Sequence, residues 1–204
     1  SEGKHTGENP MRRTILLAAP VAGMLALAAA PAAAEPYVLD KSHTVISFQV
    51  DHLGFSTVHG VFRDIEADIT FDPEAVENTQ VSFVVQAGSI DTFWAKRDEH
   101  LRNADFFDVE NHPEISFVST SVTPTGGDTA KVEGELTMLG QTQPVTFEAK
   151  LNKLGPSPFN PNQQIAGFTV TGEIDRTAFG MDYAAPAVSA VIPVRVDLEM
   201  SPAS

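Results

Sequence analysis

Residues 188–200, with the sequence VSAVIPVRVDLEM, carry the pattern that decides the fold. From Val188 to Met200 every even-numbered position is apolar, whereas Arg195, Asp197 and Glu199 occupy odd-numbered positions. Successive side chains of a β-strand point to opposite faces, so this alternation is typical of a strand with one dry and one wet face. We therefore predict a strand here, with its even-numbered side chains facing the interior.

The same period of two returns along most of the chain. It is found in segments 46–50, 81–85, 132–138, 145–151 and 168–174. Residues that favour turns (Gly, Pro, Asn and Asp) separate these segments. About eight strands with one short helical insertion predict an all-β fold, either a closed antiparallel barrel or a two-sheet sandwich.

One segment changes the parity of this pattern. Val58 and Phe62 are even-numbered, whereas the apolar side chains from Ile65 to Phe71 are odd-numbered. A slip by one residue reverses the faces of a strand, so we predict a bulge or bend near Arg63-Asp64, a device common at barrel rims.

A charged stretch around residues 95–104 is the one convincing helical segment. Asp91 and Thr92 lie just before it, and both residue types cap helices well, so we predict that one of them caps this helix.

The aromatic content favours the barrel over the sandwich. The chain contains 13 Phe and one Trp, many of them on the parity of the dry face. A barrel of about eight strands has room for its own side chains and one ligand. The alternative is that these rings simply fill the core, as in most β-domains.

The N-terminal region predicts export. Met11 is followed by Arg12 and Arg13, an apolar run over 15–30 and the sequence PAAA at 31–34. A basic start, a short apolar run and small residues at the end make up a secretory signal peptide. A membrane-spanning helix is the alternative, but Pro and Gly interrupt the run, which falls short of about 20 apolar residues.

Three segments follow from this interpretation. Residues 1–10 are an appended remnant, residues 11–34 are a signal peptide cleaved after Ala34, and residues 35–204 form the barrel domain. We therefore expect a periplasmic protein. An uncleaved leader could itself occupy a hydrophobic groove.

Charge and composition exclude several classes of function. The full chain has a formal net charge of −14, and residues 35–204 hold 10 basic and 25 acidic residues. So acidic a chain repels nucleic acid and anionic lipid surfaces. No cysteine is present, which excludes disulfides and thiol chemistry.

Ordered motifs along residues 40–181 resemble the YceI-like family of lipocalin-like proteins. They are DKSHTVISF at 40–48, HLG at 52–54, VHGVF at 58–62, SIDT at 89–92, RDEHLR at 97–102, DFFDV at 105–109, PEISFVST at 113–120, GELTMLG at 134–140, PVT at 144–146, GF at 167–168 and RTAFGM at 176–181. Phe93 departs from the family, which often has a small residue such as Gly at that position.

The resemblance implies an extended eight-stranded antiparallel lipocalin-like barrel with a short helical insertion, often periplasmic. It also implies a polyisoprenoid ligand, such as a prenyl quinone or prenyl phosphate. Burial of such a tail gains about 0.8 kcal/mol per CH₂ group, so binding needs a long dry channel rather than polar chemistry.

The candidate ligand-binding residues fall into two groups. The apolar lining, drawn from the dry faces and the insertion, consists of Phe48, Val50, Phe62, Phe83, Trp94, Phe106, Phe107, Phe117, Phe147, Phe168 and Ile192. The polar candidates for a head group at the barrel mouth are His52, Arg97, His100 and Arg102. The alternative for the polar group is a structural network that pins the insertion through Asp91, Asp98, Asp105 or Asp108.

We expect neither a metal site nor catalysis. His43, His52 and His59 lack the spacing of a compact metal motif, and no cysteine assists them. Ser42, His43 and Asp40 supply the residue types of a hydrolase, but neighbours on a strand point to opposite faces. No catalytic cofactor is expected, only a bound isoprenoid lipid.

Three functional hypotheses remain. The first is a protein that binds, and carries or stores, an isoprenoid lipid. The second is stress-related sequestration of diverse hydrophobic small molecules. The third is an enzyme that acts on a bound lipid. A homodimer stays open, and no motif identifies a protein that donates or receives the lipid.

Overall fold

The computed structural model describes residues 2–3 and 34–203. The predicted remnant and signal peptide lie almost wholly outside these residues. Among the helices that are described, none is long and apolar enough to cross a bilayer.

The described domain consists of β-strands with short helical segments between them. The strands are β1 (Glu35–Leu39), β2 (Val45–His52), β3 (Ser56–Phe62), β4 (Ile65–Phe71), β5 (Gln80–Gln86), β6 (Ile90–Asp91), β7 (Glu114–Gly126), β8 (Thr129–Met138), β9 (Gln141–Pro156), β10 (Gln164–Asp175) and β11 (Val191–Pro202). The helical segments are η1 (Lys41–His43), η2 (Val76–Asn78), η3 (Ala87–Ser89), α1 (Ala95–Leu101) and η4 (Arg176–Phe179).

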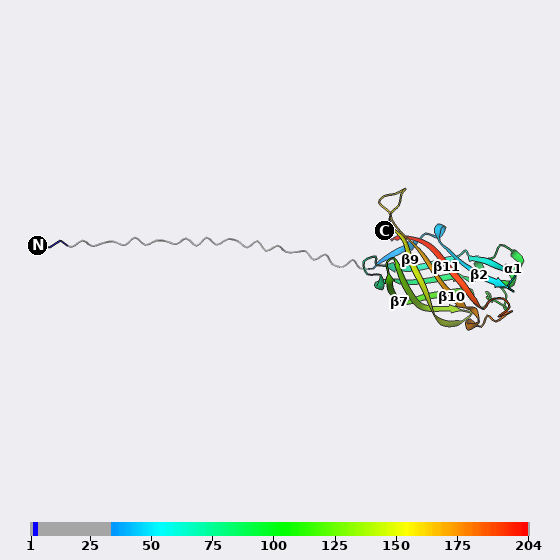
Figure 1. Ribbon diagram of the computed structural model, residues 1–204. Helices are drawn as coiled ribbons and strands as arrows, with labels where there is room; N and C mark the ends of the chain where they lie inside the picture. Colours follow the sequence, from blue (N-terminus) through cyan, green and yellow to red (C-terminus); the bar gives the residue numbers. More distant parts are fainter. Residues whose placement is uncertain (1, 4–33, 204) are drawn as a thin grey trace. The chain divides into compact units, whose positions relative to one another are not determined.

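The sheet closes into a barrel. Antiparallel pairing runs in the order β1, β4, β5, β7, β8, β9, β10 and β11, and β11 pairs back onto β1. The eight-stranded antiparallel barrel is therefore confirmed, and the sandwich alternative is wrong. Figure 1 shows the barrel with α1 at one end and the loop between β9 and β10 at the other.

Two interrupted strands complete the barrel wall. The C-terminal part of β11 pairs with β1 (Met200 opposite Leu39), and its N-terminal part pairs with β2 (Val194 opposite Phe48). Likewise β4 pairs with β1, while β3 pairs with β2. The short strands β1 and β2 together thus occupy the place of one long strand, and so do β3 and β4. The corners between β1 and β2 and between β3 and β4 bend the wall around the interior.

The predicted break near Arg63-Asp64 is confirmed. The chain leaves β3 at Phe62 and enters β4 at Ile65. The hydroxyl of Ser89 accepts hydrogen bonds from the backbone amides of Arg63 and Asp64, at 3.2 and 3.1 Å. These bonds satisfy backbone amides that have no partner where the strand ladder is interrupted. The break changes the parity of the pattern by one residue, so the apolar side chains on both sides of it face inward.

The predicted helix is present but shorter, because it ends at Leu101 rather than near residue 104. The predicted cap is wrong, since Trp94 occupies the N-cap position and makes no capping hydrogen bond with its side chain. Asp91 accepts instead from the amide of Phe93, at 2.8 Å, and so shapes the turn that precedes the helix.

Candidate functional site

The barrel encloses one long apolar cavity of about 610 Å³. It extends from Val76 and Thr79, at the η2 end, to His100 and Tyr183, at the α1 end. Its wall is almost wholly aliphatic and aromatic, because each strand turns one face of its alternating pattern inward. On β11 that face is the even-numbered one, from Ile192 to Met200, as the alternation predicted.

Most of the candidate residues line this cavity. They are Phe48, Val50, His52, Phe62, Phe83, Arg97, His100, Phe106, Phe107, Phe117, Phe147, Phe168 and Ile192. Residues from seven strands, from α1 and from the loop after α1 thus meet around a single volume. Their part in binding a ligand stays a prediction.

Glycines explain how an interior so rich in Phe still contains a cavity. Phe48 lies opposite Gly60 on β3, and Phe147 lies opposite Gly172 on β10. A Cβ atom at either glycine would overlap the facing ring. The rings therefore lie flat over the neighbouring strand, in the space of the missing side chain, rather than across the lumen.

Phe117 also lies over a glycine, although Gly134 is two residues away from its register partner, Leu136. A Cβ atom at Gly134 would lie 2.5 Å from Cζ of Phe117, and Phe117 also packs edge-on against Phe147, with ring centroids 5.5 Å apart. Sequence reasoning missed the part of these glycines, because only the register across strands reveals which residue faces each ring.

Polar groups gather where α1 covers the end of the barrel. Arg97 lines the cavity and donates from Nε to Oγ1 of Thr92, at 2.7 Å, and from Nη2 to the carbonyl of Thr92, at 2.6 Å. Nε2 of His100 lies 3.0 Å from Oδ2 of Asp105, and its ring packs edge-on against Phe106 and Tyr183. These contacts hold both side chains at the α1 end of the lumen.

Two candidates lie outside the cavity wall. Arg102 donates from Nε to the carbonyl of Gly88 and from Nη2 to that of Ile90, each at 2.8 Å, so it ties α1 to the barrel. Trp94 is 58% exposed on the outer side of the insertion. The pinning network proposed as the alternative does exist, but for Arg102 it uses backbone carbonyls rather than carboxylates.

Sequence reasoning did not single out Arg176, whose side chain also borders the cavity. It is only 5% exposed and donates to the carbonyls of Met181, Val188 and Ser189, at 2.6, 2.9 and 2.9 Å. Burial lowers the pKa of this guanidinium, against the charges of Asp182 and Asp175. A lone Arg at a strand end gives no signal in the sequence that it will organise a loop in this way.

Thr79 is a second residue that the sequence did not flag. Its hydroxyl is the buried side-chain group without a hydrogen-bond partner among residues 2–3 and 34–203, and Thr79 lines the cavity at the end opposite Arg97. The two ends of the lumen therefore each present a polar group, with an apolar stretch between them.

Comparison with known proteins identifies the family to which this barrel belongs. The model of the YceI-like domain matches residues 37–200, which is nearly the whole described domain. The chain belongs to the YceI-like family. A UPF0312 protein of Pseudomonas putida (strain GB-1) is 39% identical over 161 residues, which cover 78% of this chain and 83% of the relative.

Solved structures share the YceI-like barrel. Burkholderia cenocepacia BcnA superposes with a TM-score of 0.72 at 21% identity, covering 79% of this chain and 99% of BcnA. A polyisoprenoid binding domain from Saccharophagus degradans, implicated in plant cell wall breakdown, superposes with a TM-score of 0.62 at 12% identity, covering 83% and 99%. At these identities the likeness concerns the fold.

In this YceI-like chain Phe93 does not enter the cavity. It is 72% exposed and has φ +66°, a conformation that glycine adopts without strain. The left-handed backbone turns the ring toward solvent, so Phe93 belongs to the turn before α1 rather than to the wall of the lumen.

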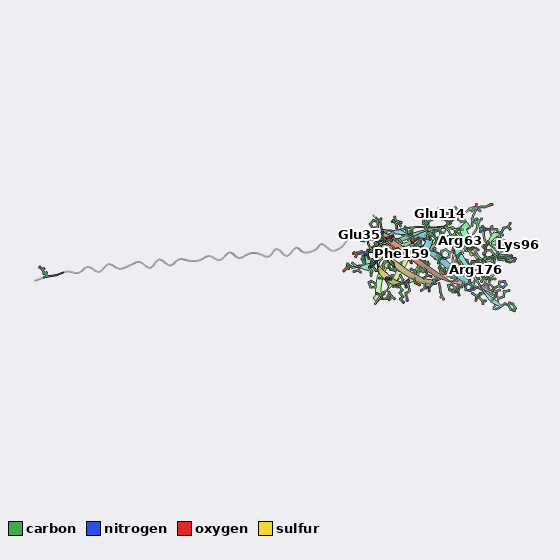
Figure 2. The ribbon with its side chains drawn as sticks, turned by 90° about the horizontal axis from the view of Figure 1, so that it is seen from above. Glu35, Arg63, Lys96, Glu114, Phe159 and Arg176 are labelled. Atoms are coloured by element: carbon green, nitrogen blue, oxygen red, sulfur yellow. The ribbon has the colours of Figure 1, made fainter. Side chains whose placement is uncertain are left out.

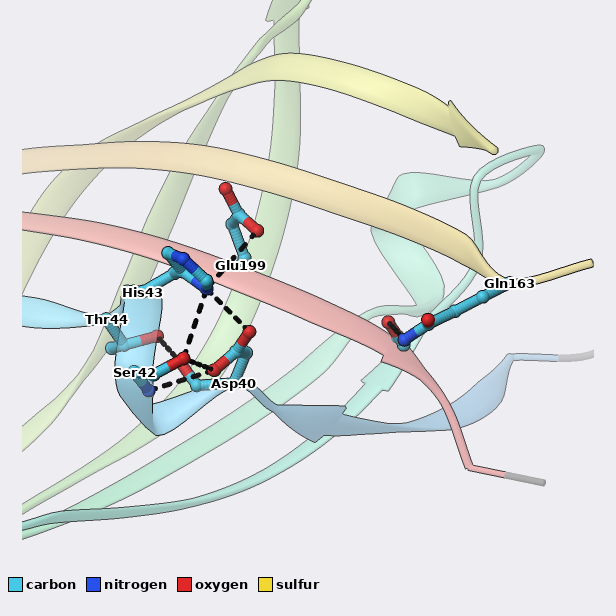
Figure 3. Close-up of polar contacts among 7 residues, drawn as sticks. Asp40, Ser42, His43, Thr44, Gln163 and Glu199 are labelled. Atoms are coloured by element: carbon cyan, nitrogen blue, oxygen red, sulfur yellow. Dashed lines mark hydrogen bonds and ion pairs between the residues drawn. The ribbon is translucent and has the colours of Figure 1, made fainter. Parts of the chain in front are cut away.

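The corner between β1 and β2 corrects another expectation. Ser42 and His43 belong to the 3-10 turn η1 rather than to a strand, so their side chains lie on the same side (Figure 3). Nδ1 of His43 lies 2.7 Å from Oδ2 of Asp40 and 3.2 Å from Oγ of Ser42, while Ser42 donates to Oδ1 of Asp40 at 2.6 Å. The argument that strand geometry separates Ser42 from His43 is wrong.

This cluster nevertheless lacks the geometry of a nucleophile and base. A triad uses one ring nitrogen of His for the nucleophile and the other for the carboxylate, whereas here Nδ1 faces both. The Ser42 proton is directed at Asp40. The three side chains instead stabilise the turn, and none of them lines the lumen of the YceI-like barrel.

Asp40, His43 and Glu199 also form the one group of potential metal ligands found within residues 2–3 and 34–203, with ligand atoms within 4.8 Å of one another. His43 and Asp40 are hydrogen-bonded and all three side chains reach solvent. Hydrogen bonding accounts for the grouping, and the expectation of no metal site stays a prediction.

Proposed function

We propose that this protein binds a long isoprenoid lipid in its barrel cavity, and carries or stores it after export to the periplasm. The observation that supports this most is the continuous apolar lumen of about 610 Å³. Small-molecule sites usually measure about 300–1,000 Å³, so the lumen has the volume of a ligand site rather than of packing defects. The polyisoprenoid named for the Saccharophagus domain agrees with this choice.

The energetics favour a chain-like ligand. A tail that buries about ten CH₂ groups would gain roughly 8 kcal/mol, before the cost of ordering the chain. Polar side chains are a minority of the lining, with Arg97, His100 and Arg176 near α1, and with Thr79, Asp128 and Thr129 among the others. Such a lumen suits a molecule with a long apolar middle and a polar terminus.

The polar terminus is where a prenyl quinone and a prenyl phosphate differ. A phosphate would pair with the guanidinium of Arg97, whereas a quinone oxygen needs only one hydrogen-bond donor such as His100. We expect Arg97→Gln to weaken a prenyl phosphate more than a prenyl quinone, and competition binding with both lipids measures the difference.

Sequestration of diverse hydrophobic compounds is the second candidate. The middle of the lumen offers no polar group to discriminate between apolar molecules, which favours broad binding. Native mass spectrometry and organic extraction of protein purified from its source separate the two. One discrete prenyl lipid supports the carrier, and a heterogeneous apolar mixture supports sequestration.

A matched pair of variants on β11 completes this test. Val196→Trp places a bulky ring in the lumen, whereas Val191→Trp places the same ring on the exposed side of the same strand. We expect the first variant to lose the extracted ligand and the second to retain it, with circular dichroism showing that both fold. Equal ligand content in both would refute binding in the lumen.

Catalysis on a bound lipid is the third hypothesis, and nothing in the lumen favours it. Reviving it would require turnover of the extracted ligand that is lost in a His100→Ala variant. No separate donor or acceptor protein is proposed, and a homodimer stays a prediction.

A further inference from the structure

Large apolar side chains project into solvent at the α1 end of the barrel. Phe55 in the turn between β2 and β3 is 86% exposed, and Phe93 and Trp94 before α1 are 72% and 58% exposed. Leu53 and Tyr183 are also exposed. We call these five residues the mouth rim. Exposed aromatic side chains of this size are costly in water, so their grouping at one end of a strongly acidic domain calls for a partner.

The segments that carry the mouth rim are joined to one another. The amide of Leu53 donates to the carbonyl of Ala187, at 3.2 Å, which ties the turn between β2 and β3 to the loop of Tyr183. The ring of Tyr183 packs against His100 of α1, with centroids 5.4 Å apart. Trp94 forms the start of the same helix. In Figure 2, Lys96 of α1 marks this end of the barrel, and Glu35 and Phe159 mark the opposite end.

The backbone holds these side chains outward. Leu53 and Phe93 have φ values of +59° and +66°, a region that large side chains rarely adopt. Asp51 accepts from the amide of Gly54, and Asp91 accepts from the amide of Phe93, at 2.9 and 2.8 Å. Both turns are therefore fixed by hydrogen bonds, so the outward direction of the rings is built into the fold.

The mouth rim is continuous with the lumen. Tyr183 belongs both to the rim and to the cavity lining, as one exposed residue that borders both. His100 and Phe106, its ring neighbours, line the cavity as well. An apolar chain that leaves the cavity at this end would pass directly onto the aromatic rim.

We propose that the mouth rim inserts into the interfacial layer of an uncharged lipid bilayer. Trp, Tyr and Phe are favoured at that depth, where a ring is partly dry and partly wet. A bilayer would extend the apolar path from the lumen, because Tyr183 borders both the rim and the cavity. Basic side chains (Arg63, Lys96, Arg97 and Arg102) lie beside Phe93 and Trp94, and Glu99, Asp105 and Asp182 are acidic residues of the same end. The net charge of the chain is −14, so we expect an anionic surface to repel the domain as a whole.

The single Trp of the chain makes this proposal directly measurable. Trp94 lies in the rim, so its fluorescence reports on this end of the barrel alone. The full chain is titrated with phosphatidylcholine vesicles, with and without bromine atoms on the acyl chains, and with no isoprenoid present. We expect a blue shift of the emission and quenching by the brominated lipid. Replacing part of the phosphatidylcholine by phosphatidylglycerol should weaken both.

Matched variants separate the rim from the rest of the chain. The double variant Phe55→Ser/Phe93→Ser should lower the vesicle partition coefficient at least about tenfold, because two buried rings are lost. Phe159→Ser removes a 98% exposed ring at the opposite end and should leave partitioning unchanged. Any binding through residues 1–34 is common to all variants, so only the difference is assigned to the rim.

Three results would overturn the proposal: no quenching of Trp94, an equal effect of Phe159→Ser, or stronger binding to phosphatidylglycerol. Since these vesicles contain no isoprenoid, failure here leaves the proposed ligand untouched. Conversely, a protein that extracts no lipid could still insert its rim.

Discussion

The carboxylate of Asp98 accepts two hydrogen bonds from Thr92, at 2.8 Å from the backbone amide and 2.5 Å from the hydroxyl. Asp98 is only 6% exposed and Thr92 is buried, so these bonds join α1 to the end of β6 out of contact with water. Thr92 in turn accepts from Arg97 of the same helix, so two side chains of α1, one of them in the cavity wall, bind this one buried residue. The insertion that covers the mouth is therefore fixed from inside.

Asp98→Ala should destabilise the protein by about 1–3 kcal/mol, because it leaves the two donors of Thr92 buried without an acceptor. Chemical denaturation measures the loss, and hydrogen exchange should show it concentrated in α1. Glu99→Ala, an exposed neighbour on the same helix, is the control and should shift stability by less than about 0.5 kcal/mol. Equal effects of the two variants would contradict this account.

Gly60→Ala should push the ring of Phe48 off the barrel wall and into the lumen. Overpacking of this kind costs about 1–3 kcal/mol, and ligand binding should fall with it. The double variant Gly60→Ala/Phe48→Leu should recover both, since the smaller side chain frees the space. Gly88→Ala is the control, because a Cβ atom there meets nothing within 4 Å. Thermal unfolding and lipid extraction report the two effects, and a harmless Gly60→Ala would argue against the packing of Phe48.

Arg176→Met should destabilise the protein by about 3 kcal/mol, since three buried carbonyls lose their donor at once. Arg176→Lys should recover little, because an ammonium group cannot reproduce the fork of three directed bonds. Arg195→Met is the matched control, as Arg195 pairs with Asp197 on the exposed side of β11 and such pairs contribute about 0–1 kcal/mol. Urea denaturation of the three variants measures these differences. A rescue by Lys would show that charge alone, rather than geometry, matters at this position.

The turn η1 should make the stability of the protein depend on pH in two ranges, the acidic range and the range above pH 6.5. The hydrogen bonds from His43 and then Ser42 lower the pKa of Asp40 to about 2, so its contribution is present above the usual value of 3.8 and is lost as pH falls toward 2. The hydrogen bond to Asp40, and then its charge, raise the pKa of His43. That contribution is complete below pH 6.5 and is lost as pH rises through the raised value.

The melting temperature of Asp40→Asn should therefore differ most from that of the unmodified protein between about pH 4 and 6.5. The two should converge as pH falls toward 2, and the difference should shrink above the raised pKa of His43, where the bonds from Ser42 remain. NMR titration of His43 should give a pKa above 6.5 that returns toward it in Asp40→Asn. A His43 titration that the substitution leaves unmoved would rule out the pairing in solution.

Local pattern was enough for much of the fold. The period of two along 188–200 correctly placed Ile192 to Met200 on the inner face, because alternation is a property of the strand itself. The change of parity at Arg63-Asp64 was readable for the same reason. The apolar candidates, from Phe48 on β2 to Ile192 on β11, came from this alternation and mostly line one cavity.

Two predictions of local structure were wrong, at positions where the sequence is compatible with more than one backbone conformation. Ser42 and His43 were treated as strand neighbours, whereas the chain turns there and brings both side chains to Asp40. Asp91 or Thr92 was expected to cap the helix, but Asp91 accepts from Phe93, and Thr92 donates to Asp98. Turn and strand differ by only a few backbone angles, and contacts from the rest of the barrel decide between them.

Residue patterns alone were enough to predict an all-β chain, the inward face of the strands with clean alternation, and a resemblance to a family of barrels. The closure between β1 and β11, the position of Phe48 over Gly60 and the three carbonyls bound by Arg176 became visible only in the folded barrel. The difference is one of range along the chain. Side-chain alternation is set between adjacent residues, whereas closure, register and the size of the lumen depend on pairs far apart in the chain.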